Sequence, residues 1–183
     1  MTFFRDSNYI FIYRDHYSEF LALPYDEFDI MLKDINELKL ENIGEAYEIE
    51  HLSADTFTSP SFPVNGIIHG PNLRFMVPLV CQRAGKPNSK VINIWFLIGT
   101  GSPFTCLTVK SLELFFGAGN VKERNFYSFA IQDQDSSIEC QVSKVGTHFE
   151  HVNILGVDAM RSLRLSAIGD INWNTGSFCL SRQ

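Results

Sequence analysis

The sequence predicts a mainly β protein that carries a small α+β extension on its N-terminal side. From Leu73 onward, short runs of β-branched and aromatic residues follow one another, as in a succession of strands. Residues that favour turns separate these runs. Before them, one stretch has apolar residues at the three- and four-residue spacing of an amphipathic helix. We therefore expect a β-rich domain preceded by a segment with one helix.

The first predicted element is a hairpin in residues 9–23. These residues are mostly aromatic and β-branched, and a charged cluster at Arg14, Asp15 and His16 interrupts them. Such a pattern is typical of two strands around a turn.

A helix is predicted next, over about residues 25–41, directly after Pro24. Acidic residues come early in this stretch and lysines later, which suits the helix dipole. Its apolar stripe is expected to pack against the core and consists of Phe28, Met31, Leu32, Ile35 and Leu38.

Residues 59–72 are predicted to be a linker, because Ser, Thr, Pro and Gly are concentrated around them without a helical period. The chain then divides into an α+β segment at 1–58, this linker, and a β-rich domain at 73–183. The first segment is short for an independent core, so we expect it to pack on the β-rich domain. The alternative is a separate interaction module, since its order of strands and helix weakly resembles a ubiquitin-like fold.

The β-rich domain has five predicted strand regions, with a hairpin tip at residues 83–90. The strand regions are Leu73–Gln82, Lys90–Gly99, Asn125–Asp133, Ser136–Val145 and His151–Val157.

Composition and charge exclude several classes of partner. The formal net charge is −6 and the pI is about 5.3, so no general basic field attracts nucleic acid. No apolar run is long enough for a membrane span or a signal-peptide core. We expect an intracellular protein, in the cytoplasm rather than the nucleus, without nucleic-acid or membrane partners.

The cysteines and histidines do not form a metal-ligand pattern. Four cysteines lie far apart, without CxxC spacing, and the five histidines form no HExxH motif. Reduced thiols are expected, with Cys106, Cys140 and Cys179 as small buried hydrophobic residues, and with no metal site and no cofactor.

Two elements of the β-rich domain together resemble the retropepsin-like aspartic protease family. The first is the apolar strand that runs into "GTGSPFTCL" from Gly99, and the second is "VNILGVDAMRSL", about 55 residues later. In that family a strand runs into Asp-Thr-Gly, and an Ile-Leu-Gly-x-Asp turn leads into a short helix. The resemblance covers residues 73–183 and implies a closed β-barrel.

The chain departs from the family at the residue that carries the chemistry. Thr100 and Gly101 match, but Gly99 stands where the family has its catalytic aspartate. The family mechanism uses two carboxylates that share one proton, and each monomer of a retropepsin dimer supplies one. No catalytic residue is therefore intact, and we expect hydrolysis by this mechanism to be lost.

Other residues of these motifs are interpreted as structural. Ser102 and Asp158 are expected to build the turns, Asp158 at the start of the closing helix, and Asn174 in "NTGS" is interpreted as a hairpin turn. The segment between the two motifs is shorter than a full flap, the hairpin that covers a bound peptide in the family, so we expect an uncovered cleft.

The closing stretch, "GDINWNTGSFCLSRQ", is similar to the family's last strands, which form a dimer sheet in its cellular members. Exposed edge strands are usually paired or covered. The resemblance thus implies a homodimer, with a contact strand that contains Ile171, Trp173, Phe178 and Leu180.

The sequence therefore predicts a catalytically inactive retropepsin-like domain that acts as a dimerisation scaffold or binds a peptide or protein partner. The alternative is an aspartic endopeptidase from which the catalytic aspartate has been removed at Gly99 by substitution.

Overall fold

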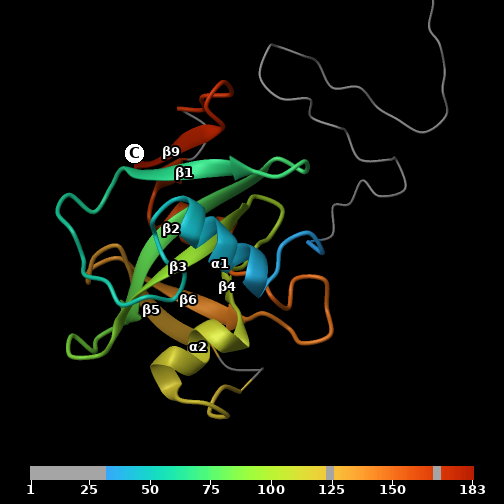
Figure 1. Ribbon diagram of the computed structural model, residues 1–183. Helices are drawn as coiled ribbons and strands as arrows, with labels where there is room; N and C mark the ends of the chain where they lie inside the picture. The colour runs from blue at the N-terminus through green and yellow to red at the C-terminus, as the bar shows by residue number, and fades with distance from the viewer. Residues whose placement is uncertain (1–31, 123–125, 167–169) are drawn as a thin grey trace, which may run out of the picture.

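The structure, a computed structural model, describes residues 32–122, 126–166 and 170–183 (Figure 1). The hairpin predicted in residues 9–23 lies outside the described residues. Within them the chain forms three α-helices: α1 (Glu37–Ala46), α2 (Val109–Phe116) and α3 (Val157–Ser162). It also forms nine strands: β1 (Val64–His69), β2 (Arg74–Arg83), β3 (Val91–Gly99), β4 (Cys106–Leu107), β5 (Tyr127–Ile131), β6 (Ser137–Val142), β7 (Ile154–Gly156), β8 (Leu165–Ser166) and β9 (Ser177–Arg182).

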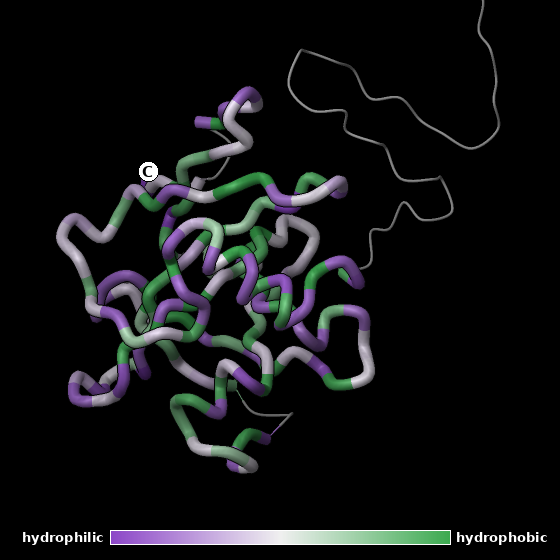
Figure 2. Tube along the Cα trace, in the orientation of Figure 1, coloured by the Kyte–Doolittle hydropathy of each residue, from purple (hydrophilic) through white to green (hydrophobic). Residues whose placement is uncertain are grey.

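Six of these strands close into a barrel, in the order β3-β7-β4-β6-β5-β2, and β2 pairs with β3 to complete the ring. The alternation of β2 sends Val77, Leu79 and Cys81 into the barrel core, where they meet Phe96 of β3 and Phe129 of β5. Figure 2 shows hydrophobic residues along these central strands and hydrophilic ones in the β2–β3 loop. The prediction of a mainly β fold with a closed barrel is confirmed.

A ribbon of three further strands extends from the barrel through β2. β1 pairs with β2 at Ile67–His69 and with β9 at Val64–Ile67, and β9 pairs with β8 on its other side. β1 lies inside the range predicted as a linker, so residues 64–69 belong to the sheet. Gly66 and the preceding Pro63 hid the strand pattern in the sequence.

The helix of the extension begins later than predicted, at Glu37 rather than near residue 25. Residues 25–31 lie outside the described range, and Leu32 to Asn36 are not helical. Asn36 caps α1 because its side chain accepts a hydrogen bond from the Lys39 N–H at 2.9 Å. The predicted range therefore joined a non-helical stretch to the first part of the helix.

The described part of the extension packs on the outer face of the barrel. Leu32 and Ile35 from the non-helical stretch, with Leu40 and Ile43 from α1, bury the outward residues of β2 and β3: Met76, Trp95 and Leu97. The chain after α1 then runs along β3, where the Leu52 N–H donates to the Asn93 carbonyl at 2.9 Å. This placement agrees with an extension on the barrel.

Helix α2 follows β4, in the region where a short flap was predicted. Its cap is Thr108, whose hydroxyl accepts a hydrogen bond from the Ser111 N–H at 3.1 Å. Leu112 is fully buried, and Phe115 and Phe116 pack against the barrel core. Among residues 108–122 the structure forms a helix and turns rather than the strands of a hairpin. No helix within the described ranges is long and apolar enough to cross a membrane.

Candidate functional site

The turn after β3 is the site that the sequence singles out. Gly99 is the last residue of β3 and pairs in parallel with Gly156, the last residue of β7. The Gly99 carbonyl accepts a hydrogen bond from the Ser102 N–H at 2.9 Å, which closes the turn. Thr100 and Gly101 form its exposed tip. The two predicted motifs are therefore side by side, although 57 residues separate Gly99 from Gly156.

Ser102 ties this turn to the start of α3. Its hydroxyl donates to the Phe104 carbonyl at 2.6 Å, and its own carbonyl accepts from the Val157 N–H at 2.9 Å. Gly156 leaves no room for a side chain, since a Cβ there would lie 2.3 Å from the carbonyl carbon of Phe104. The turn is thus held in a defined shape by backbone groups.

Asp158 is fully engaged in building the same turn. Its carboxylate accepts hydrogen bonds from the Thr105 N–H at 3.0 Å, the Thr105 hydroxyl at 2.6 Å and the Ala159 N–H at 2.6 Å. The Thr105 hydroxyl accepts in turn from the Gly156 N–H at 3.0 Å. This network agrees with the predicted structural role of Asp158, because all three donors point at its two oxygens.

The space beside Gly99 is filled by Ile154. A Cβ added to Gly99 would lie 2.4 Å from Cγ2 of Ile154, whose side chain is buried. An aspartate at this position therefore requires Ile154 to move. Neither the turn nor its neighbour α3 presents a carboxylate other than that of Asp158.

Two apolar residues that are hydrogen-bonded to the turn are exposed on the surface. Phe104 is 50% exposed and Val157 is 42% exposed, and both are bonded through their backbone to Ser102.

The predicted dimer strand has most of its apolar residues inside the monomer. Phe178 and Leu180 are buried in the barrel core, and Ile171 is half-buried against it. Trp173 is 63% exposed and contacts Phe75 edge-on at 6.2 Å. Because β9 lies between β1 and β8, it is not the free edge that the sequence predicted. Dimerisation itself stays a prediction.

The NTGS stretch forms the predicted hairpin turn. Asn172 and Ser177 exchange two backbone hydrogen bonds across it, at 2.8 and 3.1 Å. Gly176 has a φ of +62°, which suits glycine at the end of such a turn.

A polar cluster joins α1 to α2 and was not predicted. His51 is buried, and its Nδ1 accepts a hydrogen bond from the backbone N–H of Trp95 at 3.1 Å. The proton of the neutral imidazole is therefore on Nε2, which lies 3.8 Å from the Glu37 carboxylate. Lys110 of α2 lies 3.2 Å from Glu37 and 2.9 Å from Glu41. Burial and the Lys110 charge lower the pKa of His51 to about 4, so it is neutral at pH 7.

The four cysteines are free thiols, as predicted. Cys81, Cys106 and Cys140 are buried, but the prediction that Cys179 is buried was wrong, because its side chain is partly exposed on β9. Burial, with a smaller effect from Asp158, raises the pKa of Cys106 to about 11. Within the described ranges, no group of three or more His, Cys, Asp or Glu side chains is placed to hold a metal ion.

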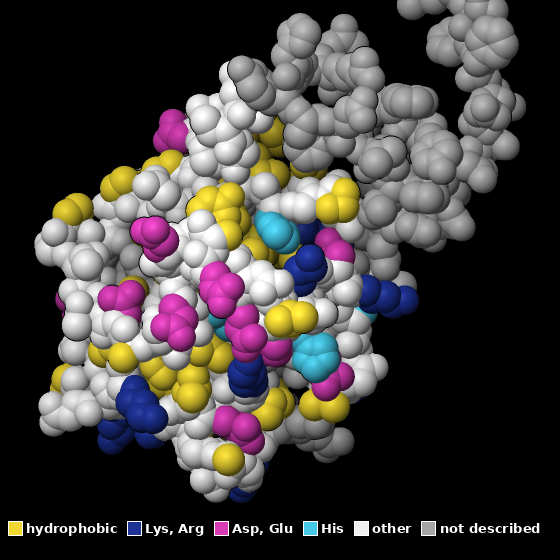
Figure 3. Space-filling model, in the orientation of Figure 1, with side chains coloured by type: hydrophobic (Ala, Val, Ile, Leu, Met, Phe, Trp, Pro, Cys, Tyr) yellow, Lys and Arg dark blue, Asp and Glu magenta, His cyan; other side chains and the backbone are white. Residues whose placement is uncertain are grey.

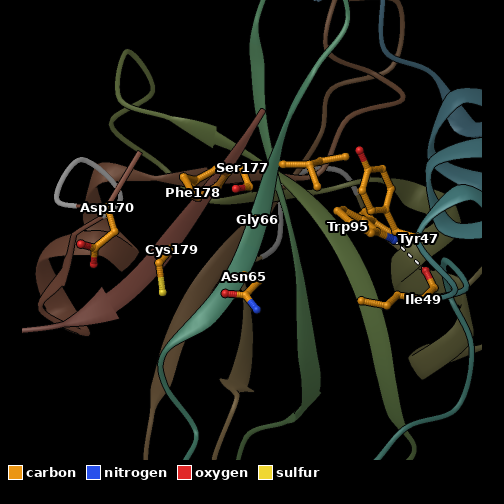
Figure 4. A pocket seen from close by; sticks show the side chains of 10 residues that line it. Tyr47, Ile49, Asn65, Gly66, Trp95, Asp170, Ser177, Phe178 and Cys179 are labelled. Atoms are coloured by element: carbon orange, nitrogen blue, oxygen red, sulfur yellow. Dashed lines mark hydrogen bonds between the residues drawn. The ribbon is translucent and has the colours of Figure 1, made fainter. Parts of the chain in front are cut away.

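An apolar groove on the β1–β9 ribbon is a second site that sequence reasoning missed. It has a volume of about 480 Å³ and lies between the Tyr47–Ile49 loop and the ribbon (Figure 4). Its residues come from four distant parts of the chain, so no local sequence pattern predicts it.

A comparison of the chain with protein-family models, curated proteins and solved structures found no match.

Proposed function

We propose that the protein is a catalytically inactive retropepsin-like domain that works as a dimerisation or peptide-binding scaffold. The arrangement around Gly99 supports this proposal. A strand enters the turn, a second strand lies parallel to it, and a short helix follows that second strand. This is the order of elements that the resemblance implies for the family.

The observation that carries the proposal is the absence of a free carboxylate at the turn. Aspartic proteases need two carboxylates that share one proton, so that one activates water and the other donates to the scissile carbonyl. Gly99 has no side chain, and Ile154 occupies the place of one. The Asp158 carboxylate is engaged by three donors. Two copies of this chain would bring no working dyad together.

The contact surface of the scaffold is the exposed apolar rim of the turn. Phe104 and Val157 contribute apolar area there, and the turn that holds them is fixed by hydrogen bonds. A preformed surface binds with little loss of conformational entropy. In the described residues after β4, helix α2 leaves this surface without a covering hairpin.

Peptidase assays test the loss of catalysis and the alternative of a protease disabled by substitution. Wild type, Gly99→Asp and Gly99→Asp/Ile154→Ala are compared on a peptide library from acid to neutral pH. The double variant removes the Cγ2 atom that collides with the new side chain. Ile154→Ala alone is the control for folding, since it opens a cavity in the core.

We expect no cleavage by wild type or by folded variants. Cleavage by either aspartate variant, blocked by a transition-state analogue, would instead support the disabled protease. Cleavage by wild type would refute the proposal.

The scaffold role is tested by the oligomeric state. Phe104→Asp and Val157→Asp place a charge in the rim, and we expect either to shift a dimer to monomer in analytical ultracentrifugation. Val145→Asp is the matched control, because Val145 is 48% exposed but lies in the loop after β6. A wild-type monomer that binds no peptide from the library would contradict the proposal.

A further inference from the structure

The groove on the outer face of the β1–β9 ribbon crosses β1 from an aromatic wall to an acidic side chain. Figure 4 shows the Tyr47–Ile49 loop and Trp95 on one side of β1, and Cys179 with Asp170 on the other. Paired residues of adjacent strands share a face and form the groove floor. These floor residues are Asn65 and Ile67 of β1 with Cys179 and Ser177 of β9. The groove therefore offers apolar, polar and charged groups to one ligand.

The aromatic wall of the groove is preformed. The indole N–H of Trp95 donates to the Ile49 carbonyl at 2.8 Å, and the Tyr47 ring packs against Trp95 with centroids 6.3 Å apart. Tyr47 is 49% exposed and Ile49 is 38% exposed, so their apolar surfaces face solvent in the described structure. A fixed wall loses little conformational entropy when an apolar side chain packs on it.

One edge of β1 is open beside this wall. β1 pairs with β2 only at Ile67–His69, so within the described ranges Asn65 has no strand partner on that side. The Ile68 N–H donates to the Gly176 carbonyl on the β9 side, so the alternation directs the backbone N–H and carbonyl of Asn65 toward the β2 side. Trp95 lies on that side as well, because β2 pairs with β1 at one edge and with β3 at the other. An open edge of this kind binds an extended segment through main-chain hydrogen bonds.

The charge around the groove is acidic. The described residues 40–73, which run from α1 through the aromatic wall to β1, contain five acidic residues and no Lys or Arg. Glu48 and Glu50 are exposed next to the wall residues in the sequence, and Asp170 lines the opposite side; we call these three residues the acidic border. Figure 3 shows acidic side chains gathered on the face that α1 covers. Such a border attracts Lys and Arg side chains and repels anionic ligands.

We propose that the groove binds an extended, basic segment of a partner protein, in which an apolar side chain stands between Lys or Arg residues. The apolar side chain packs on Tyr47 and Trp95, the cations face the acidic border, and the backbone of the segment pairs with Asn65. None of the described residues in the turn after Gly99 lines this groove. The inference therefore goes beyond the proposed function and does not rest on it.

Peptide binding to the full chain tests the proposal. The probe is the labelled heptapeptide KVKLKVK, whose affinity is measured by fluorescence anisotropy at about 0.05 M salt. EVELEVE reverses the charge of the probe, KSKSKSK removes its apolar side chains, and KVKLKVK with N-methylated peptide bonds cannot donate its backbone N–H groups. We expect KVKLKVK to bind at least about tenfold more tightly than each of these three peptides.

Charge reversal at the acidic border locates the bound peptide. Glu48→Lys/Glu50→Lys should lower the preference for KVKLKVK over EVELEVE by at least about tenfold and strengthen the binding of EVELEVE, a gain that misfolding cannot produce. Asp135→Lys is the matched control, because Asp135 is an exposed acid in the turn between β5 and β6, and the preference should stay unchanged. Weaker binding to Phe104→Asp, with no effect of Glu48→Lys/Glu50→Lys, would place the peptide on the turn after Gly99 and overturn the proposal.

Hydrogen exchange is the independent measurement. The Asn65 amide should exchange at least about tenfold more slowly when KVKLKVK saturates the protein, because the bound backbone accepts its N–H. No binding of KVKLKVK below about 1 mM would overturn the proposal. Equal affinity for any of the matched peptides, or an Asn65 amide that stays unprotected in the complex, would overturn it as well.

Discussion

Replacing Asp158 with alanine should destabilise the protein by about 3 kcal/mol. The carboxylate receives three hydrogen bonds, two of them from Thr105, a residue with no solvent exposure. Alanine offers no acceptor, so the Thr105 N–H and hydroxyl are left without this partner inside the protein.

The magnitude follows from the cost of unpaired buried donors. Each costs about 1–3 kcal/mol, and we take about 1.5 kcal/mol for each of the two Thr105 donors. The lower half of the range applies because Asp158 is itself only half-buried, so water reaches part of the vacated space. Asp158→Asn keeps one of the two acceptor oxygens and should cost about half as much.

Urea unfolding measures these losses as changes in the unfolding free energy at constant m-value. Asp135→Ala is the control, since Asp135 is exposed, and its effect should stay within about 0.5 kcal/mol. A double-mutant cycle with Thr105→Val should give a coupling above about 1 kcal/mol. An Asp158→Ala loss no larger than the control, or additivity with Thr105→Val, would refute the structural role of Asp158.

Three further outcomes are expected. The free energy of unfolding should fall by about 3 kcal/mol between pH 6.5 and pH 4. The folded-state pKa of His51 is about 4, so the unfolded state binds the proton first as the pH falls. Urea titrations at both pH values check this, and a His51→Gln variant whose unfolding free energy depends on pH in the same way would contradict it. Gly66→Ala should lower the free energy of unfolding by about 1–3 kcal/mol, since a Cβ would lie 2.2 Å from the Phe178 ring. Gly101→Ala should lower it less, because no atom lies within 4 Å of a Cβ there. Equal losses of stability in thermal melts would count against this packing. In the native protein Cys179 should react with Ellman's reagent well before the other three thiols, which are buried; rapid reaction of all four would show that the barrel opens.

The barrel strands were predictable because their residues alternate between two environments or run as continuous apolar stretches. The sequence placed the end of β3 at Gly99, as observed, since small turn residues follow a buried run. The predicted start of α1 was wrong because Leu32 and Ile35 have helical spacing but are buried from a non-helical stretch, in one cluster with Ile67 and Trp95. The Asn36 cap was the signal that was overlooked.

Helix α2 was not foreseen because Leu112, Phe115 and Phe116 all face apolar surroundings, which removes the contrast that marks a surface helix. Gly99 and its lost carboxylate were visible from the residue type alone. The filling of that space by Ile154 was not, because it depends on how β3 and β7 approach each other. The groove was equally invisible, since it joins residues 47–49 to β1 and β9.

The pairing of β1 with β9 also governs when the molecule can assemble. Val64 pairs with Leu180, so this ladder closes a loop of 116 residues. Closing so long a loop costs entropy before the new contacts compensate for it, which slows folding in proteins rich in distant pairings. During synthesis, the ribbon and the groove floor cannot form until β9 has left the ribosome. Until then β1 has only its pairing with β2 at Ile67–His69, and its other edge is exposed to association with other nascent chains.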